Sequence, residues 1–133
     1  MATTKIVCKT TAEFEGKLAE AQGEAAKLSR PLLILFTGAV SPETGKSWCP
    51  DCVAADPVIH KCLLELEGGS VLLECPVLRE EYRGNSEYLY RKHPLFGLKC
   101  VPTLIKFDNG KVKYSLDDSQ SQDEDLVRTL LSS

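Results

Sequence analysis

Apolar residues follow two different spacing patterns along the chain, one typical of strands and one typical of helices. The order of these patterns predicts the element order β-α-β-α-β-α-β-β-α. Short apolar runs predict strands, because a strand that is covered on both faces shows no polar alternation. Segments with apolar residues three or four positions apart predict helices that bury one face. The predicted strands are Lys5–Lys9, Leu32–Phe36, Ser70–Cys75, Thr103–Phe107 and Lys111–Ser115.

Local signals mark the boundaries of the first two helices. Thr10 and Glu13 form a capping box, which favours a helix start because it satisfies two unpaired backbone amides. Pro31 ends this first helix, since proline has no N–H to donate. A second helix is predicted from Cys49 onward, and Pro57 within it predicts a kink.

The second half of the chain carries weaker signals. Residues 79–85 predict a charged loop, and a short helix is predicted between residues 86 and 93. Asn109-Gly110 predicts the turn of a β-hairpin, because both residues accept positive φ angles. Ser121 and Glu124 form a second capping box, which predicts the start of the last helix.

Composition and charge exclude several classes of protein. The chain has 133 residues, 43% hydrophobic and 26% charged, which predicts one globular α/β domain over residues 1–133. Its net charge of −3, without a block of Lys and Arg, argues against binding to nucleic acid or to a membrane surface. The longest apolar run, Leu32–Phe36, is far shorter than the ~20 residues of a membrane helix. Because the N-terminus shows no secretory signal pattern, we expect a cytoplasmic protein. We also expect it to be a monomer.

Only one pair among the six cysteines has a spacing that indicates chemistry by itself, Cys49 and Cys52. If the second helix starts at Cys49, this thiol lies against unpaired amides at the positive end of the helix dipole, which stabilises a thiolate. A thiolate is the nucleophile of disulfide exchange. Cys52 follows one turn later and is placed to resolve a mixed disulfide. The pair therefore predicts reversible dithiol–disulfide exchange.

A C-x-x-C pair is also half of many zinc sites. The other half is hard to find here, because His60 and Cys62 follow Cys52 by eight and ten residues, or about 12–15 Å along a helix. His93 and Cys100 lack a paired spacing. Disulfide exchange is therefore favoured over zinc binding.

Three further motifs give the chain a resemblance to thioredoxin-fold proteins. Trp48 precedes the first cysteine, and Pro57 lies five residues after the second. Val101-Pro102-Thr103, with the following run to Asn109-Gly110, is similar to a conserved run of that family. The resemblance, over roughly residues 5–131, implies a thioredoxin fold, with a central mixed β-sheet flanked by helices. It also implies that Pro102 is a cis-proline that exposes the backbone of Val101 to substrate.

Several departures from ordinary thioredoxins resemble one subgroup, the small Clot-type thioredoxin-related proteins. The dipeptide between the cysteines is Pro50-Asp51, and about eight extra residues lie within Gly38–Ser47, before the active-site helix. The strand position where thioredoxins usually bury an aspartate falls near Ile34, so the proton carrier of those proteins is missing here. Asp118 stands where a thioredoxin is expected to have a glycine.

This resemblance implies a disulfide reductase that uses Cys49 and Cys52 and binds no cofactor. Reducing equivalents would come from NADPH through thioredoxin reductase. The subgroup prefers small or exposed disulfides, such as cystine and mixed disulfides, and a weak peroxidase activity is attached to it. We expect the inserted loop to obstruct flat protein surfaces beside Cys49.

Residues around the pair are expected to tune its reactivity and to hold substrate. Asp51 opposes thiolate formation by its charge, whereas the helix terminus and Lys46 favour it. Pro50, the other residue between the two cysteines, is also expected to tune their redox properties. Trp48 is expected to form a substrate platform. Cys100 is either an auxiliary thiol near the site or a packed strand-end residue.

The remaining candidates are interpreted as structural. Cys8, Cys62 and Cys75 are expected in the core, and His60 and His93 on the surface. The segment 79–83 is a solvated loop, with a possible role in selecting acidic partners.

Two other functions stay open. One is a glutathione-dependent, glutaredoxin-like enzyme, suggested by the C-P-D-C sequence and by Asp117-Asp118. The other is a non-enzymatic thioredoxin-fold module that binds signalling partners.

Overall fold

The computed structural model describes residues 3–133 and contains a five-stranded mixed sheet in the order β1-β3-β2-β4-β5. β1 and β2 pair with β3 in parallel, whereas β4 pairs antiparallel with β2 and β5. The strands are β1 (Thr3–Val7), β2 (Leu32–Gly38), β3 (Ser70–Val77), β4 (Thr103–Asp108) and β5 (Lys111–Leu116). The helices are α1 (Phe14–Leu28), α2 (Pro50–Glu65), α3 (Arg79–Tyr82), α4 (Leu89–Lys92) and α5 (Glu124–Ser132), with 3-10 turns η1 (Thr11–Glu13) and η2 (Gln120–Gln122).

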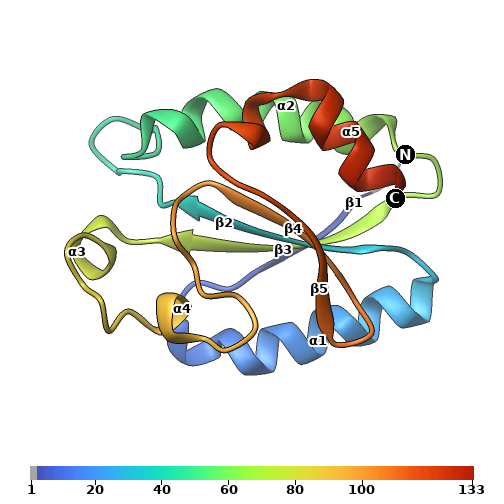
Figure 1. Cartoon of the computed structure of the whole chain (residues 1–133), viewed down its shortest axis with the longest axis horizontal. Coiled ribbons are helices and arrows are strands. Elements are labelled where there is room, and N and C mark those ends of the chain that lie inside the picture. The colour runs from blue at the N-terminus through green and yellow to red at the C-terminus, as the bar shows by residue number, and fades with distance from the viewer. Residues whose placement is uncertain (1–2) are drawn as a thin grey trace.

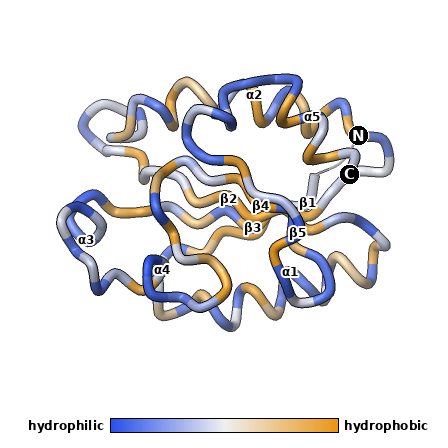
Figure 2. The backbone as a smooth tube through the Cα atoms, in the orientation of Figure 1, coloured by the Kyte–Doolittle hydropathy of each residue, from blue (hydrophilic) through white to orange (hydrophobic). Residues whose placement is uncertain are grey.

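Helices cover both faces of the sheet, with α2 and α5 on one side and α1 on the other (Figure 1). Successive side chains of a strand point to opposite faces, so each central strand feeds two cores. On β2, Leu33 and Leu35 pack with α2 and α5, whereas Ile34 and Phe36 pack with α1. Figure 2 shows the apolar segments gathered along these central strands. The expected mixed sheet flanked by helices is therefore confirmed.

An aromatic cluster fills the core between α1 and the sheet, and Phe14 lies at its centre. The Phe14 ring lies within 5.1–6.1 Å of four other rings. One of these is His93, whose side chain is only 10% exposed and whose Nε2 lies 2.8 Å from Glu15 Oε2. The prediction of a surface position was therefore wrong for His93, because the ring covers the edge of the aromatic cluster. His60 does lie at the surface of α2, with 41% of its side chain exposed.

Two local predictions differ from the structure between β3 and β4. The segment predicted as a charged loop contains α3, and the following helix is shorter than expected, since α4 begins only at Leu89. Tyr82 gives α3 an anchor, because its ring packs against the core between α1 and the sheet. Sequence periodicity cannot reveal a helix of a single turn that is held by one side chain.

The start of α5 also differs. Asp123 is its N-cap residue, and the Asp123 carboxylate accepts the N–H groups of Asp125 and Leu126. Ser121, the predicted cap, is instead buried in η2, where its hydroxyl donates to the carbonyl of Leu116. The first capping box is closer to expectation, although it starts the 3-10 turn η1 directly before α1.

No helix within residues 3–133 is long and apolar enough to cross a membrane.

Replacing Phe14 by Ala is expected to lower the free energy of unfolding by about 3–5 kcal/mol, because a central aromatic side chain is removed from a closed core. Tyr114→Ala is the matched control, since Tyr114 is 48% exposed on an edge strand and its loss should cost about 1 kcal/mol or less. Urea denaturation of both variants measures the difference, and equal losses would contradict the proposed role of the cluster.

Candidate active site

Cys49 occupies the N-cap position of α2, as the sequence predicts. Its Sγ accepts the backbone N–H of Cys52 at 3.2 Å, one of the amides that a helix start leaves unpaired. Pro50 fills the first helical position, where its missing N–H costs nothing. The Cys49 sulfur therefore lies where backbone amides favour negative charge.

Cys52 lies one turn inside α2 and is 2% exposed. Its Sγ accepts the backbone N–H of Gly38 at 3.2 Å. Burial, together with the hydrogen bond to Cys49, raises the pKa of the Cys52 thiol to about 12. At neutral pH this thiol is protonated, so the two cysteines have different chemical settings although only two residues lie between them.

The peptide bond between Val101 and Pro102 is cis, as the resemblance implies. It brings the carbonyl oxygen of Val101 to 3.5 Å from Cys49 Sγ. Val101 itself is 6% exposed and lies just before β4. A segment far from Cys49 in the sequence thus forms the second wall of the site.

Gly38 and Ser47 form the joint between the end of β2 and the start of α2, and neither role could be predicted from the sequence pattern. The Ser47 hydroxyl donates to the Gly38 carbonyl at 2.8 Å, and its oxygen accepts the Cys49 N–H at 3.2 Å. A Cβ atom on Gly38 would lie 2.6 Å from Ser47 Oγ and 2.9 Å from Cys49 Cβ. Only glycine lets the strand approach Cys49 this closely.

Trp48 is held at the edge of the site by its indole group. Its Nε1 donates to the carbonyl of Val77 at 2.7 Å, and its ring lies 5.9 Å from that of Tyr82. The ring is half-buried, so it packs against the core and also borders the space beside Cys49. Asp51 is exposed, and its carboxylate accepts a hydrogen bond from Gln122.

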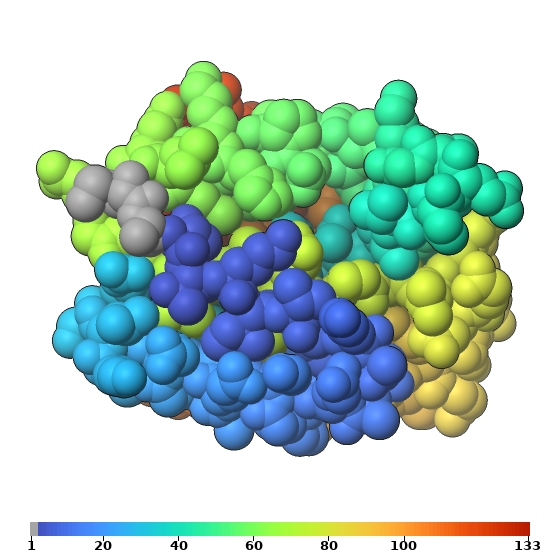
Figure 3. Space-filling view, turned by 180° about the vertical axis from the view of Figure 1, so that it is seen from behind, coloured from blue at the N-terminus to red at the C-terminus, as the bar shows by residue number. Residues whose placement is uncertain are grey.

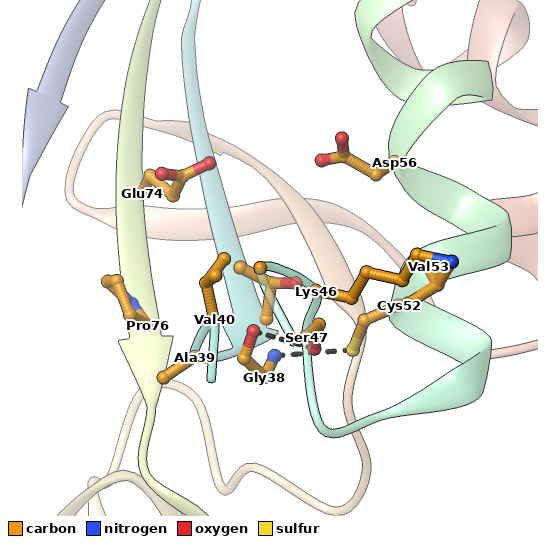
Figure 4. Close-up of a pocket in the computed structure, with 12 residues that line it drawn as sticks. Gly38, Ala39, Val40, Lys46, Ser47, Cys52, Val53, Asp56, Glu74 and Pro76 are labelled. Carbon is orange, nitrogen blue, oxygen red and sulfur yellow. Dashed lines mark hydrogen bonds between the residues drawn. The ribbon is translucent and has the colours of Figure 1, made fainter. Parts of the chain in front are cut away.

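A cavity of about 270 Å³ lies on the Cys52 side of the site. The inserted loop forms part of its wall, and Lys46 faces this cavity rather than the space beside Cys49. Figure 4 shows the carboxylates of Asp56 and Glu74 turned toward the space between α2 and β3. Glu74 is paired with Lys5 at 3.2 Å.

The sequence places the missing carboxylate of ordinary thioredoxins near Ile34 on β2. Ile34 faces α1, on the side of the sheet away from α2. Leu35 is the β2 residue that packs with α2. Both side chains are apolar and fully buried, so β2 brings no proton carrier to Cys52 from either position.

The other four cysteines lie apart from Cys49 and Cys52, with one exception. Cys8, Cys62 and Cys75 are buried as expected, and burial raises the pKa of Cys75 well above its usual value. Cys100 is half-buried with its Sγ 3.7 Å from Thr103 Oγ1, and it borders the same pocket as Cys49. In residues 3–133 no group of three His, Cys, Asp or Glu side chains is placed to hold a metal ion.

The sheet order and the cysteine pair at the start of α2 define a thioredoxin-fold protein with a C-x-x-C site. A family model described as "Thioredoxin domain-containing protein 17-like, thioredoxin domain" matches residues 8–133, and the chain belongs to this family. The Arabidopsis thaliana thioredoxin-like protein Clot is 34% identical over 129 residues, which cover 97% of this chain and 96% of that protein.

Other similarities are narrower. A Leishmania braziliensis protein named acireductone dioxygenase is 47% identical over 79 residues, which cover 56% of this chain. The chain spans only 23–28% of the length of this and two other Leishmania proteins of that name. Oxidised thioredoxin O1 from Arabidopsis thaliana has a TM-score of 0.58 at 22% identity, covering 96% of this chain and 98% of that one, which shows a shared fold.

Replacing Gly38 by Ala is expected to destabilise the protein by about 1–3 kcal/mol, because the added methyl group collides with Ser47 and Cys49. The same collision should displace Cys49 and lower its rate of alkylation by iodoacetamide, measured by peptide mapping. Gly23→Ala is the control, since a methyl group there meets nothing within 4 Å and α1 should gain about 0.5–1 kcal/mol. A Gly38→Ala protein with normal stability and alkylation would contradict the tight joint.

Proposed function

We propose that this protein is a thiol–disulfide reductase in which Cys49 attacks the substrate and Cys52 resolves the intermediate. The observation that carries the proposal is the unequal setting of the two sulfurs. Cys49 Sγ accepts a backbone N–H at the helix start, whereas the buried Cys52 thiol has a raised pKa. A nucleophile and a protonated resolving thiol are the two parts that the exchange reaction needs.

The reaction proceeds in two exchanges. The Cys49 thiolate attacks one sulfur of the substrate disulfide, so a Cys49–substrate disulfide forms and the first substrate thiolate leaves. Cys52 then attacks Cys49 Sγ, the Cys49–Cys52 disulfide forms, and the second substrate sulfur leaves and takes up the Cys52 proton. Two electrons pass from the protein dithiol to the substrate disulfide, which becomes two thiols.

The proposed substrates are small or exposed disulfides, such as cystine and mixed disulfides on proteins. Trp48, Val101 and Pro102 would bind them beside Cys49, while Pro50 and Asp51 tune the thiolate. NADPH through thioredoxin reductase would return the protein to its dithiol form without a bound cofactor, and a weak peroxidase activity would use the same thiolate. Family membership and the position of Val101 against Cys49 support this proposal.

A trapping experiment tests the order of the two cysteines. Reduced Cys52→Ser protein should accumulate one equivalent of mixed disulfide at Cys49 when mixed with cystine, because nothing resolves the intermediate. Reduced Cys49→Ser protein should form none at either position. Intact-mass spectrometry and peptide mapping give the result, and a mixed disulfide on Cys52 in the second variant would overturn the assignment.

Steady-state turnover tests the electron donor. NADPH consumption with thioredoxin reductase and cystine should proceed with wild-type protein and fall at least a hundredfold with Cys49→Ser, because the attacking sulfur is lost. Turnover with only glutathione and glutathione reductase would favour the glutaredoxin-like function. No turnover with either donor would favour the interaction module.

The inserted loop should restrict protein substrates more than small ones. It lies beside α3 at the end of the molecule where α2 begins, as Figures 1 and 3 show. Deleting residues 40–46 should raise the rate with insulin disulfides several-fold relative to cystine, because a flat surface can then approach the site. Single-turnover oxidation of the reduced protein measures both rates, and an unchanged ratio would contradict the obstructing loop.

A further inference from the structure

A pocket of about 400 Å³ opens directly beside Cys49 and shares no lining residue with the cavity near Cys52. Trp48, Cys49 and Val101 form its inner wall, and Arg79, Arg83 and Asp118 bring charges to it. Its volume suits a small molecule rather than a protein segment. A disulfide bound here has its sulfur within reach of the nucleophile.

Arg79 and Arg83 border this pocket because Tyr82 holds α3 against the protein core. The Tyr82 ring packs near Trp48, and its hydroxyl donates to the carbonyl of Lys99 at 3.4 Å. Arg79 begins α3 and Arg83 is its C-cap residue four positions later, so both lie on one side of the turn. That side borders the pocket, whereas Glu80 and Glu81 of the same helix do not.

Arg79 and Arg83 differ from the other three arginines of the chain in having free guanidinium groups. Within the described residues, neither makes an ion pair, a side-chain hydrogen bond or a ring contact. Arg30 donates to Thr4, Arg91 donates to a carbonyl and lies over a ring, and Arg128 is paired with carboxylates. Two unpaired guanidinium groups beside one carboxylate make this pocket positive in a chain of net charge −3.

We propose that this pocket selects small disulfides that carry a carboxylate near the sulfur–sulfur bond, with Arg79 and Arg83 binding the anion while Cys49 attacks. The proposal rests on the reductase function and names its substrate class. Guanidinium groups suit this task, since their planar N–H donors match the two oxygens of a carboxylate. The negative charge of Asp118 repels the carboxylate of the substrate and therefore lowers the preference for anionic disulfides.

Three disulfides with the same two-carbon arms test the proposal: neutral 2-hydroxyethyl disulfide, anionic dithiodipropionate and cationic cystamine. Rates of oxidation of the reduced protein are each divided by the rate of dithiothreitol with the same disulfide, which removes differences between leaving groups. The wild type should prefer the anionic over the neutral disulfide about tenfold, and the preference should shrink between about 20 mM and 500 mM salt.

Variants locate the effect. The R79Q/R83Q double variant should lose the anionic preference, because both guanidinium groups are gone, while Asp118→Asn should increase it. The double variant K17Q/K27Q, an equal loss of two positive charges on α1, should leave the ratio unchanged. Since every result is a ratio to the neutral disulfide, a general loss of activity or stability does not imitate the expected change.

The outcomes separate the two proposals. A wild-type protein that reacts with the neutral disulfide but shows no charge preference overturns the substrate class and leaves the reductase standing. A preference that survives in R79Q/R83Q also overturns it, because the anion is then bound elsewhere. Failure to react with any of the three disulfides overturns the reductase itself.

Discussion

The site depends on one close approach, that of the end of β2 to the start of α2. The Gly38 amide donates to Cys52 Sγ and its carbonyl accepts the Ser47 hydroxyl, which in turn holds the Cys49 amide. These short contacts set where α2 begins and therefore which sulfur receives the unpaired amides. A side chain at Gly38 would open this joint. The setting of Cys49 and Cys52 therefore depends on Gly38, a residue that has no side chain.

The periodic parts of the fold could be predicted from the sequence, because burial on a sheet or helix leaves a regular apolar pattern. The cysteine pair and the cis peptide before Pro102 were predictable as well, since they lie in short motifs. Contacts between distant segments left no such pattern. The anchoring of α3 by Tyr82, the packing of His93 on Phe14 and the close approach at Gly38 depend on which segments the sheet brings together.

Six cysteines share a small molecule without equal reactivity, and their positions explain why. Cys8 lies just after β1, beside Cys75 of β3, in the core next to α1. Burial raises the pKa of Cys75, whereas the hydrogen bond with Cys75 lowers the pKa of Cys8 to about 7. Cys49 alone combines a helix start with a neighbouring pocket, and Cys100 borders that pocket without a helix start. Position, and not acidity alone, therefore distinguishes these thiols, since Cys8 is fully buried whereas Cys49 borders a pocket.

The inserted loop is closed at its base as a small hairpin. Val40 pairs with Ser47, and the Ser41 amide donates to the Lys46 carbonyl at 2.8 Å. Residues added or lost beyond this closure change the tip alone, and doubling a loop's length costs only about 0.6 kcal/mol. The loop can therefore diverge among related chains at little thermodynamic cost. The length of this loop and the reactivity of the sulfurs can then evolve independently.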